Sequence, residues 1–279
     1  MSTRSKTFST WVLLSLAANG LLVVAIAWVL MRQYQWSMPS PVSQSVAASH
    51  LPESKPDSIT ELGPRHQLNY QQWVALLQKE ADVVATEKPK NLAILLGDSI
   101  SLWFPNELLP PERTWLNQGI SGETSAGLLN RLEFLDKTQP EVIYLLIGIN
   151  DLIRGVKDET ILANQQLIIR YLRQVHPQTK IVVQSILPHG GDKVTWEGRD
   201  RLLSLPNSRI QEINKQLKAI AKDEGVMYLD LYPLFADNDG NLKAELSTDG
   251  LHLSPQGYSV WRNALIVFNQ FVLEPLALK

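Results

Sequence analysis

Hydrophobic residues occur in this chain first as one long continuous run and later as short separate runs. Residues 10–31 form the long run, which is almost wholly apolar. An α-helix needs about 20 apolar residues to cross a bilayer, whereas the apolar part of a cleaved signal peptide has roughly 7–15. The long run therefore predicts an uncleaved transmembrane anchor over residues 10–31.

The charges that flank the run predict its orientation. Arg4 and Lys6 precede it, and Arg32 follows it closely. Basic residues are enriched on the cytoplasmic side of membrane helices. We therefore expect residues 1–9 in the cytoplasm and the remainder of the chain, held by a single-pass anchor, on the extracytoplasmic side of the membrane.

The composition changes twice after the predicted anchor. Residues 32–65 are rich in Pro and Ser, which is typical of a flexible linker that cannot bury a hydrophobic core. From residue 66 to residue 279 the pattern becomes that of a globular domain, because apolar residues return at regular spacing.

Short apolar runs alternate with amphipathic stretches in this domain. The apolar runs resemble parallel strands buried on both faces, and they cover residues 92–96, 142–147, 181–183 and 226–229. The amphipathic stretches predict helices over residues 70–85, 125–135, 159–175, 209–224 and 255–271. Ser254 suits the N-cap of the last helix and Pro255 its first turn. The alternation predicts an α/β fold with a parallel sheet covered by helices on both faces.

Composition excludes several classes of function. The formal net charge is -2 and the sequence pI is about 6.2, so the basic excess typical of nucleic-acid binding is missing. The chain has no cysteine, which excludes disulfides, thiolate metal sites and a cysteine nucleophile.

Polar residues follow two of the predicted strands, at the sheet edge where α/β proteins bind ligands. Gly97, Asp98 and Ser99 end the first strand, and a serine there suits a nucleophile that opens the next helix. Asn150 follows the strand over residues 142–147, and its amide is a candidate donor to an oxyanion. Gly119, in a loop between them, is a candidate backbone donor because glycine lets a ligand approach closely.

A candidate general base lies near the end of the chain. Serine is a weak nucleophile until a base takes its proton, and the unperturbed pKa of histidine, about 6.5, suits this task. His252 comes just before the last predicted helix, and Asp249 lies close enough in sequence to orient it through one tight turn.

These four blocks, in this order, resemble the SGNH hydrolase family, also called GDSL esterases and lipases. The resemblance covers roughly residues 90–270, with Ile100 where the GDSL name has leucine. It implies a flavodoxin-like three-layer α/β/α sandwich and a serine esterase that needs no metal or other cofactor. It also implies that Ser99 attacks the ester, that His252 acts as the general base, and that Asp249 orients His252. The implied oxyanion hole consists of Ser99 N–H, Gly119 N–H and the Asn150 amide.

The resemblance leaves the substrate open, from short acyl esters of sugars to lipids. We expect Trp103, His189 and Trp196 as substrate contacts, with residues 188–206 forming one wall of the site. The predicted anchor points to lipid or envelope-glycan esters. Two alternatives remain: an envelope-glycan O-acyltransferase with the same triad, and a non-catalytic surface binding module. The sequence predicts no oligomeric state.

Overall fold

The structure, a computed structural model, describes residues 68–273 of the chain. The predicted cytoplasmic segment 1–9, the anchor 10–31 and the linker 32–65 lie outside these residues, so those predictions remain predictions. Between residues 68 and 273, no helix is both long enough and apolar enough to cross a membrane.

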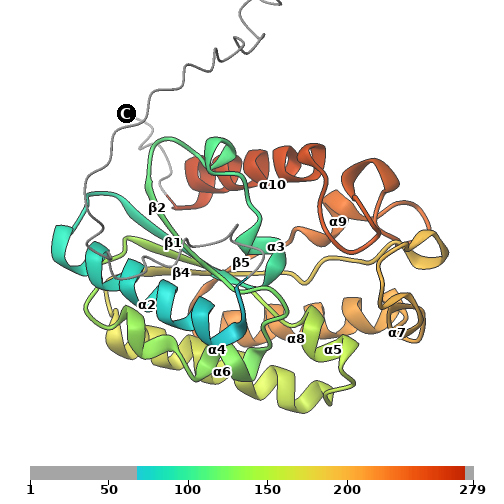
Figure 1. The fold of residues 1–279 in the computed structure, drawn as a ribbon, viewed down its shortest axis with the longest axis horizontal. Helices are drawn as coiled ribbons and strands as arrows, with labels where there is room; N and C mark the ends of the chain where they lie inside the picture. Colours follow the sequence, from blue (N-terminus) through green and yellow to red (C-terminus); the bar gives the residue numbers. More distant parts are fainter. Residues whose placement is uncertain (1–67, 274–279) are drawn as a thin grey trace, which may run out of the picture. The chain divides into compact units, whose positions relative to one another are not determined.

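The core of the described region is a five-stranded sheet in which all neighbouring strands are parallel (Figure 1). The strand order is β2-β1-β3-β4-β5, which is the order of a flavodoxin-like sheet. The strands are β1 (Leu92–Gly97), β2 (Thr114–Gly119), β3 (Val142–Leu146), β4 (Lys180–Gln184) and β5 (Met227–Leu229).

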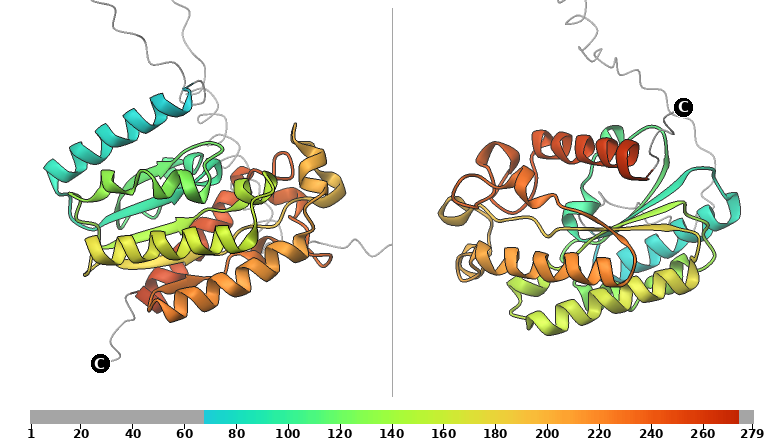
Figure 2. Two further views of the ribbon diagram at one scale, coloured as in Figure 1. Left: turned by 90° about the horizontal axis from the view of Figure 1, so that it is seen from below. Right: turned by 180° about the vertical axis from the view of Figure 1, so that it is seen from behind.

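Helices connect the strands and cover both faces of the sheet. The long helices are α2 (Tyr70–Glu87), α6 (Asp158–Val175), α8 (Asn207–Asp223) and α10 (Pro255–Phe268). The short helices are α3 (Ser99–Leu102), α4 (Ser125–Leu129), α5 (Ile149–Ile153), α7 (Arg199–Leu203) and α9 (Tyr232–Phe235). Helix α10 lies on one side of the sheet, and α2, α4, α6 and α8 lie on the other (Figures 1 and 2).

The alternating direction of side chains along a strand explains why both faces are apolar. In β1, Ala93 and Leu95 belong to the hydrophobic cluster that contains Trp261 of α10. Their neighbours Ile94 and Leu96 belong to the cluster that contains residues of α2, α4 and α6. Because both faces of the sheet are apolar, each face must be covered by helices. The strands therefore form the middle layer of a three-layer structure.

The sequence predicted four of the five strands and all four long helices. It predicted no strand at β2, whose sequence Thr-Trp-Leu-Asn-Gln-Gly is half polar because it forms an edge of the sheet. The predicted helix over residues 125–135 is split, since α4 ends at Leu129 and a 3₁₀ turn covers Leu132–Leu135. The predicted cap is confirmed, because the Ser254 side chain accepts a hydrogen bond from Gly257 N–H.

Replacement of Trp261 tests how much the packing of α10 on the sheet contributes to stability. Its side chain is fully buried, and its Nε1–H donates to Gln184 Oε1 at 2.7 Å. We expect Trp261→Ala to lower the free energy of unfolding by about 3–5 kcal/mol, as for other large buried aromatics. Urea denaturation measures this loss. Val267→Ala, on the exposed side of the same helix, is the control and should change stability by less than about 0.5 kcal/mol.

Candidate active site

The polar residues singled out above lie at the carboxyl ends of the central strands. Ser99 is the first residue of α3, directly after β1, and Asn150 lies in the first turn of α5, after β3. Strand β1 pairs with β2 on one side and with β3 on the other. From β1 the chain first adds β2 on one side of the sheet and then β3 on the other, so the strand order reverses here, and this is where open α/β sheets place their ligand sites.

Ser99, His252 and Asp249 form a continuous chain of hydrogen bonds. Ser99 Oγ lies 3.1 Å from His252 Nε2, and His252 Nδ1 lies 2.7 Å from Asp249 Oδ2. The serine and the histidine are 153 residues apart in sequence, so the fold alone brings them together. The geometry is that of a nucleophile, a base and a group that orients the base.

The loop before α10 fixes the carboxylate and the imidazole in one unit. Asp249 Oδ1 accepts hydrogen bonds from the backbone N–H groups of Leu251 and His252, at 2.9 and 2.8 Å. Gly250 lies between them with a φ of 86°, a conformation that favours glycine. Burial would raise the pKa of Asp249, but the hydrogen bonds from His252 and from the backbone outweigh it and lower that pKa. Asp249 therefore stays ionised beside the imidazole.

Trp103 covers the imidazole from the solvent side. It is the C-cap residue of α3, and its ring centroid lies 4.5 Å from that of His252, with the rings tilted by 32°. Ser99 and His252 are both buried, whereas the Trp103 side chain is 44% exposed. The predicted contact residue thus lies beside the base, where it both shields the base and meets solvent.

The candidate oxyanion donors differ in how they are bonded. Asn150 Nδ2 is buried and has no hydrogen-bond partner among the described residues. Gly119 N–H, in contrast, already donates to Asn117 Oδ1 at 3.0 Å. Gly119 also packs closely under α3, because an added Cβ would lie 2.4 Å from Leu102 N. For Gly119 to serve an oxyanion, its bond to Asn117 would have to open.

Gly119, predicted in a loop, is the last residue of β2, and the loop that follows contains a second candidate glycine, Gly122. Gly122 has a φ of 74°, and its N–H makes no hydrogen bond to another residue of the described range. Its carbonyl accepts from Arg154 Nη2 at 2.6 Å. The run Ile120-Ser121-Gly122 was visible in the sequence, but only the backbone geometry distinguishes the two glycines.

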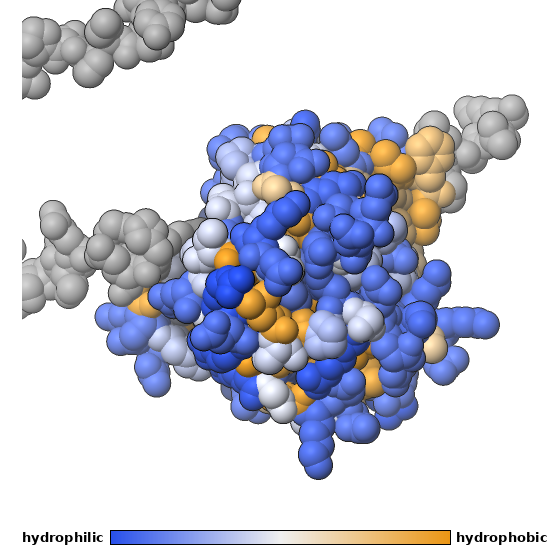
Figure 3. Space-filling model, turned by 90° about the vertical axis from the view of Figure 1, so that its right-hand side faces the viewer, coloured by the Kyte–Doolittle hydropathy of each residue, from blue (hydrophilic) through white to orange (hydrophobic). Residues whose placement is uncertain are grey.

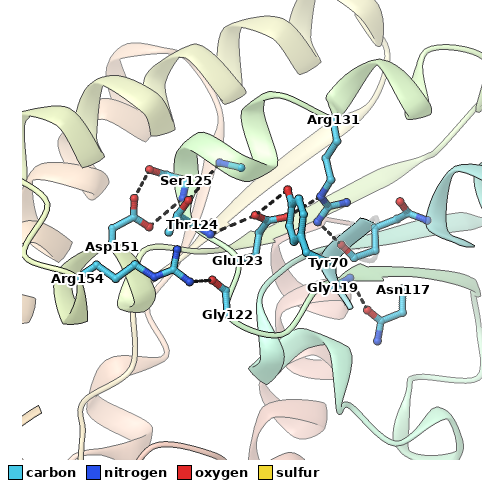
Figure 4. A network of polar contacts seen from close by, with 12 residues as sticks. Tyr70, Asn117, Gly119, Gly122, Glu123, Thr124, Ser125, Arg131, Asp151 and Arg154 are labelled. Atoms are coloured by element: carbon cyan, nitrogen blue, oxygen red, sulfur yellow. Dashed lines mark hydrogen bonds and ion pairs between the residues drawn. The ribbon is translucent and has the colours of Figure 1, made fainter. Parts of the chain in front are cut away.

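A polar network holds this loop against α5 and α4 (Figure 4). Asp151 accepts from both Ser125 N–H and Ser125 Oγ, at 2.8 and 2.6 Å. On the other side of Gly122, Glu123 pairs with Arg131 at 2.8 Å, and both side chains are almost fully buried. Helix α5 therefore carries Asn150 and also fixes the loop opposite it.

The segment after β4 contacts the Asp249 loop instead of forming a free wall. The backbone N–H groups of Thr195 and Trp196 both donate to the Asp249 carbonyl, at 2.9 and 3.0 Å. Trp196 is half-buried beneath the Arg201 guanidinium, which lies 5.5 Å from its ring centroid. This segment supports the carboxylate that orients His252.

His189 lies inside the loop that follows β4. It is buried, with Nε2 2.6 Å from the Leu205 carbonyl, and Nδ1 accepts from Gly191 N–H at 3.1 Å. Both ring nitrogens are thus used inside the loop, and burial lowers the pKa of His189. These bonds show that His189 holds the loop in shape, and a substrate contact at this residue stays a prediction. The sequence showed its position after β4 but not its bonding.

The comparisons with known proteins agree with this site. A model of the GDSL-like Lipase/Acylhydrolase family matches residues 95–260. The chain belongs to this family, which confirms the resemblance seen in the sequence and makes the protein a hydrolase at the level of the family.

Individual relatives are more distant. The chain is 27% identical over 175 residues to Platelet-activating factor acetylhydrolase IB subunit alpha2 of Gallus gallus, covering 60% of this chain and 70% of that protein. It is 28% identical over 194 residues to Isoamyl acetate-hydrolyzing esterase 1 homolog of Bos taurus, covering 59% and 75%. A solved structure from Streptococcus pneumonia, described under the name platelet activating factor, has a TM-score of 0.60 and 29% identity, covering 72% of this chain and 97% of that chain.

Asp98, next to the nucleophile, gives a pH test of the site. Burial is the main reason why the pKa of Asp98 is raised from 3.8 to about 7. The negative charges of Asp151 and Glu123 also raise this pKa, whereas the hydrogen bond that Ile100 N–H donates to Asp98 lowers it. Because the pKa is raised in the folded state, protonation of Asp98 stabilises the fold. This stabilisation is fully present below pH 3.8 and is lost as the pH rises through about 7. Asp98→Asn has no such proton to lose.

We therefore expect Asp98→Asn to gain stability relative to the wild type by about 4 kcal/mol between pH 4 and pH 8, since each pKa unit corresponds to 1.36 kcal/mol. Urea denaturation of both proteins at the two pH values measures the change. Asp200→Asn, at an exposed aspartate of α7, controls for loss of a surface carboxylate. A gap between variant and wild type that stays constant with pH would contradict the prediction.

Proposed function

We propose that this protein is a serine ester hydrolase that cleaves carboxylic esters through an acyl-enzyme on Ser99. The observation that carries the proposal is the hydrogen-bonded chain from Ser99 Oγ through His252 to Asp249. Membership of the acylhydrolase family and the named activities of the relatives support the same class of reaction.

The proposed reaction has two steps. In the first, Ser99 Oγ attacks the ester carbonyl carbon while His252 Nε2 accepts the serine proton. The carbon–oxygen bond to the alcohol then breaks, and His252 returns this proton to the leaving oxygen. In the second step, water attacks the acyl carbon while His252 Nε2 takes a proton from the water. The bond between the acyl carbon and Ser99 Oγ then breaks, and His252 gives the proton to Ser99 Oγ as the acid leaves. Asp249 stabilises the imidazolium in both steps.

The negative charge on the carbonyl oxygen needs donors that are fixed beforehand. We assign this role to Ser99 N–H, which lies in the first helical turn and has no partner within the helix, and to Asn150 Nδ2. The third donor comes from the loop after β2. Gly119 is the donor predicted from the sequence, and the unpaired N–H of Gly122 is the alternative that the bonding of Gly119 to Asn117 favours.

Ser99→Ala tests the nucleophile. We expect kcat on p-nitrophenyl acetate to fall by at least about 10⁴-fold, because no other group replaces the attacking oxygen. Labelling by a fluorophosphonate probe should be lost with it. Ser101→Ala is the matched control, since Ser101 is a buried serine of the same helix whose hydroxyl has no partner among the described residues. Unchanged turnover in Ser99→Ala would refute the proposed function.

Asn150→Ala tests the oxyanion donor. Loss of one such donor costs about 10²–10³ in kcat, so we expect this decrease with little change in KM. Thermal denaturation of the same variant separates this role from a structural one. If Asn150 only supports the fold, the melting temperature falls and kcat per folded molecule stays close to that of the wild type.

A further inference from the structure

A small pocket lies beside the catalytic histidine and is lined mainly by aromatic residues. Its volume is about 260 Å³, and its walls come from α2, the loop after β2 and the end of α3. We call it the aromatic pocket, and its lining residues are Leu68, Tyr70, Trp73, Trp103 and Ser121.

Two of these residues tie the pocket to the active site. Trp103 packs its ring against the imidazole of His252, at 4.5 Å between centroids. Ser121 immediately precedes Gly122 in the loop after β2. In the reaction proposed above, His252 delivers a proton to the leaving alcohol, so the alcohol must lie on the imidazole side of the serine. The aromatic pocket is next to that position.

The walls of the pocket are held in place before any ligand binds. A capping box between Asn69 and Gln72 fixes the start of α2, where Tyr70 is the first helical residue. Tyr70 Oη donates to Glu123 Oε1 at 3.4 Å, and Glu123 is itself paired with buried Arg131 (Figure 4). The Trp73 side chain is buried in a small cluster beneath. Such rigidity reduces the entropy lost on binding.

The chemistry of the lining distinguishes between possible ligands. Leu68 is the one aliphatic residue among the five, so the pocket offers little to a long acyl chain. None of the five carries a charge, and Glu123 behind Tyr70 is neutralised by Arg131, so a charged headgroup finds no counter-charge. What remains is exposed aromatic surface on Tyr70 and Trp103, together with the hydroxyls of Tyr70 and Ser121.

Aromatic side chains with a polar group at one end suit a ring that has apolar faces and a polar rim. The volume is just below the range of about 300–1,000 Å³ for sites that hold drug-sized ligands, which fits one ring. The face of the molecule that Figure 3 presents carries mostly hydrophilic residues, with hydrophobic residues in separate areas. This surface suits a soluble, polar substrate better than a lipid aggregate.

We propose, resting on the ester hydrolase function above, that the aromatic pocket binds the alcohol part of the substrate and that this alcohol is a sugar ring. Tyr70 and Trp103 contact the faces of the ring, and the hydroxyl of Ser121 bonds to its rim. The pocket thus selects acyl esters of carbohydrates by the alcohol that leaves, and the acyl group lies outside it.

The test keeps the acyl group constant and changes the alcohol. Full-length wild type and Tyr70→Ala are assayed on ethyl acetate and on a mono-O-acetylated methyl glucoside. We expect the ratio of kcat/KM for the sugar ester to that for ethyl acetate to fall about tenfold in Tyr70→Ala, mainly through KM. Tyr171→Ala is the matched control, because Tyr171 also bonds to a carboxylate, that of Asp136, from the surface of α6.

A second measurement does not depend on turnover. Ser99→Ala is titrated with methyl glucoside while tryptophan fluorescence is followed, since Trp73 and Trp103 both line the pocket. We expect a saturable change that is lost in Ser99→Ala/Tyr70→Ala. If the wild type hydrolyses no ester, the proposed function fails and this titration alone decides whether the pocket binds a sugar.

Three results would overturn the proposal. The first is an unchanged ratio in Tyr70→Ala. The second is a change in the preference among ethyl acetate, ethyl butyrate and ethyl octanoate with no change in the alcohol ratio, because the pocket would then hold the acyl group. The third is a fluorescence titration without a saturable change in Ser99→Ala.

Discussion

The pairing of β1 with two neighbours is the constraint on which the site depends. Parallel pairing ends with Gly97 opposite Gly119 on one side and opposite Leu146 on the other. Three chain segments therefore leave the sheet at the same level and direction. Ser99, the amide of Asn150 and the loop after β2 come together because the sheet register brings their three segments to the same edge.

Close packing at this edge requires small residues. An added Cβ on Gly97 would lie 2.3 Å from the Leu146 carbonyl, and one on Gly119 would meet the backbone of Leu102. With glycine at both positions, α3 sits directly over the strand ends. Its first residue, Ser99, is then held at the position where His252 reaches it from the far end of the chain.

The site places two carboxylates in opposite electrostatic situations. Asp98 precedes Ser99 in sequence and Asp249 bonds to His252, and burial opposes ionisation of both aspartates. Asp249 overcomes burial because three donors point at it, whereas Asp98 has an oxygen with no partner among the described residues. Full burial and the nearby negative charges of Asp151 and Glu123 thus raise the pKa of Asp98, whereas Asp249 is less buried and its hydrogen bonds lower its pKa.

The sequence by itself determined the α/β class, four strands, the long helices and the choice of Ser99, Asp249 and His252 as candidate site residues, because apolar periodicity and short local motifs carry that information. It could not separate Gly119 from Gly122, since the difference lies in which N–H is already bonded. It also gave no sign that His189 is satisfied internally or that Tyr70, far from Ser99 in sequence, lies near the base. Those facts depend on contacts between segments distant in the chain, which only the tertiary structure decides.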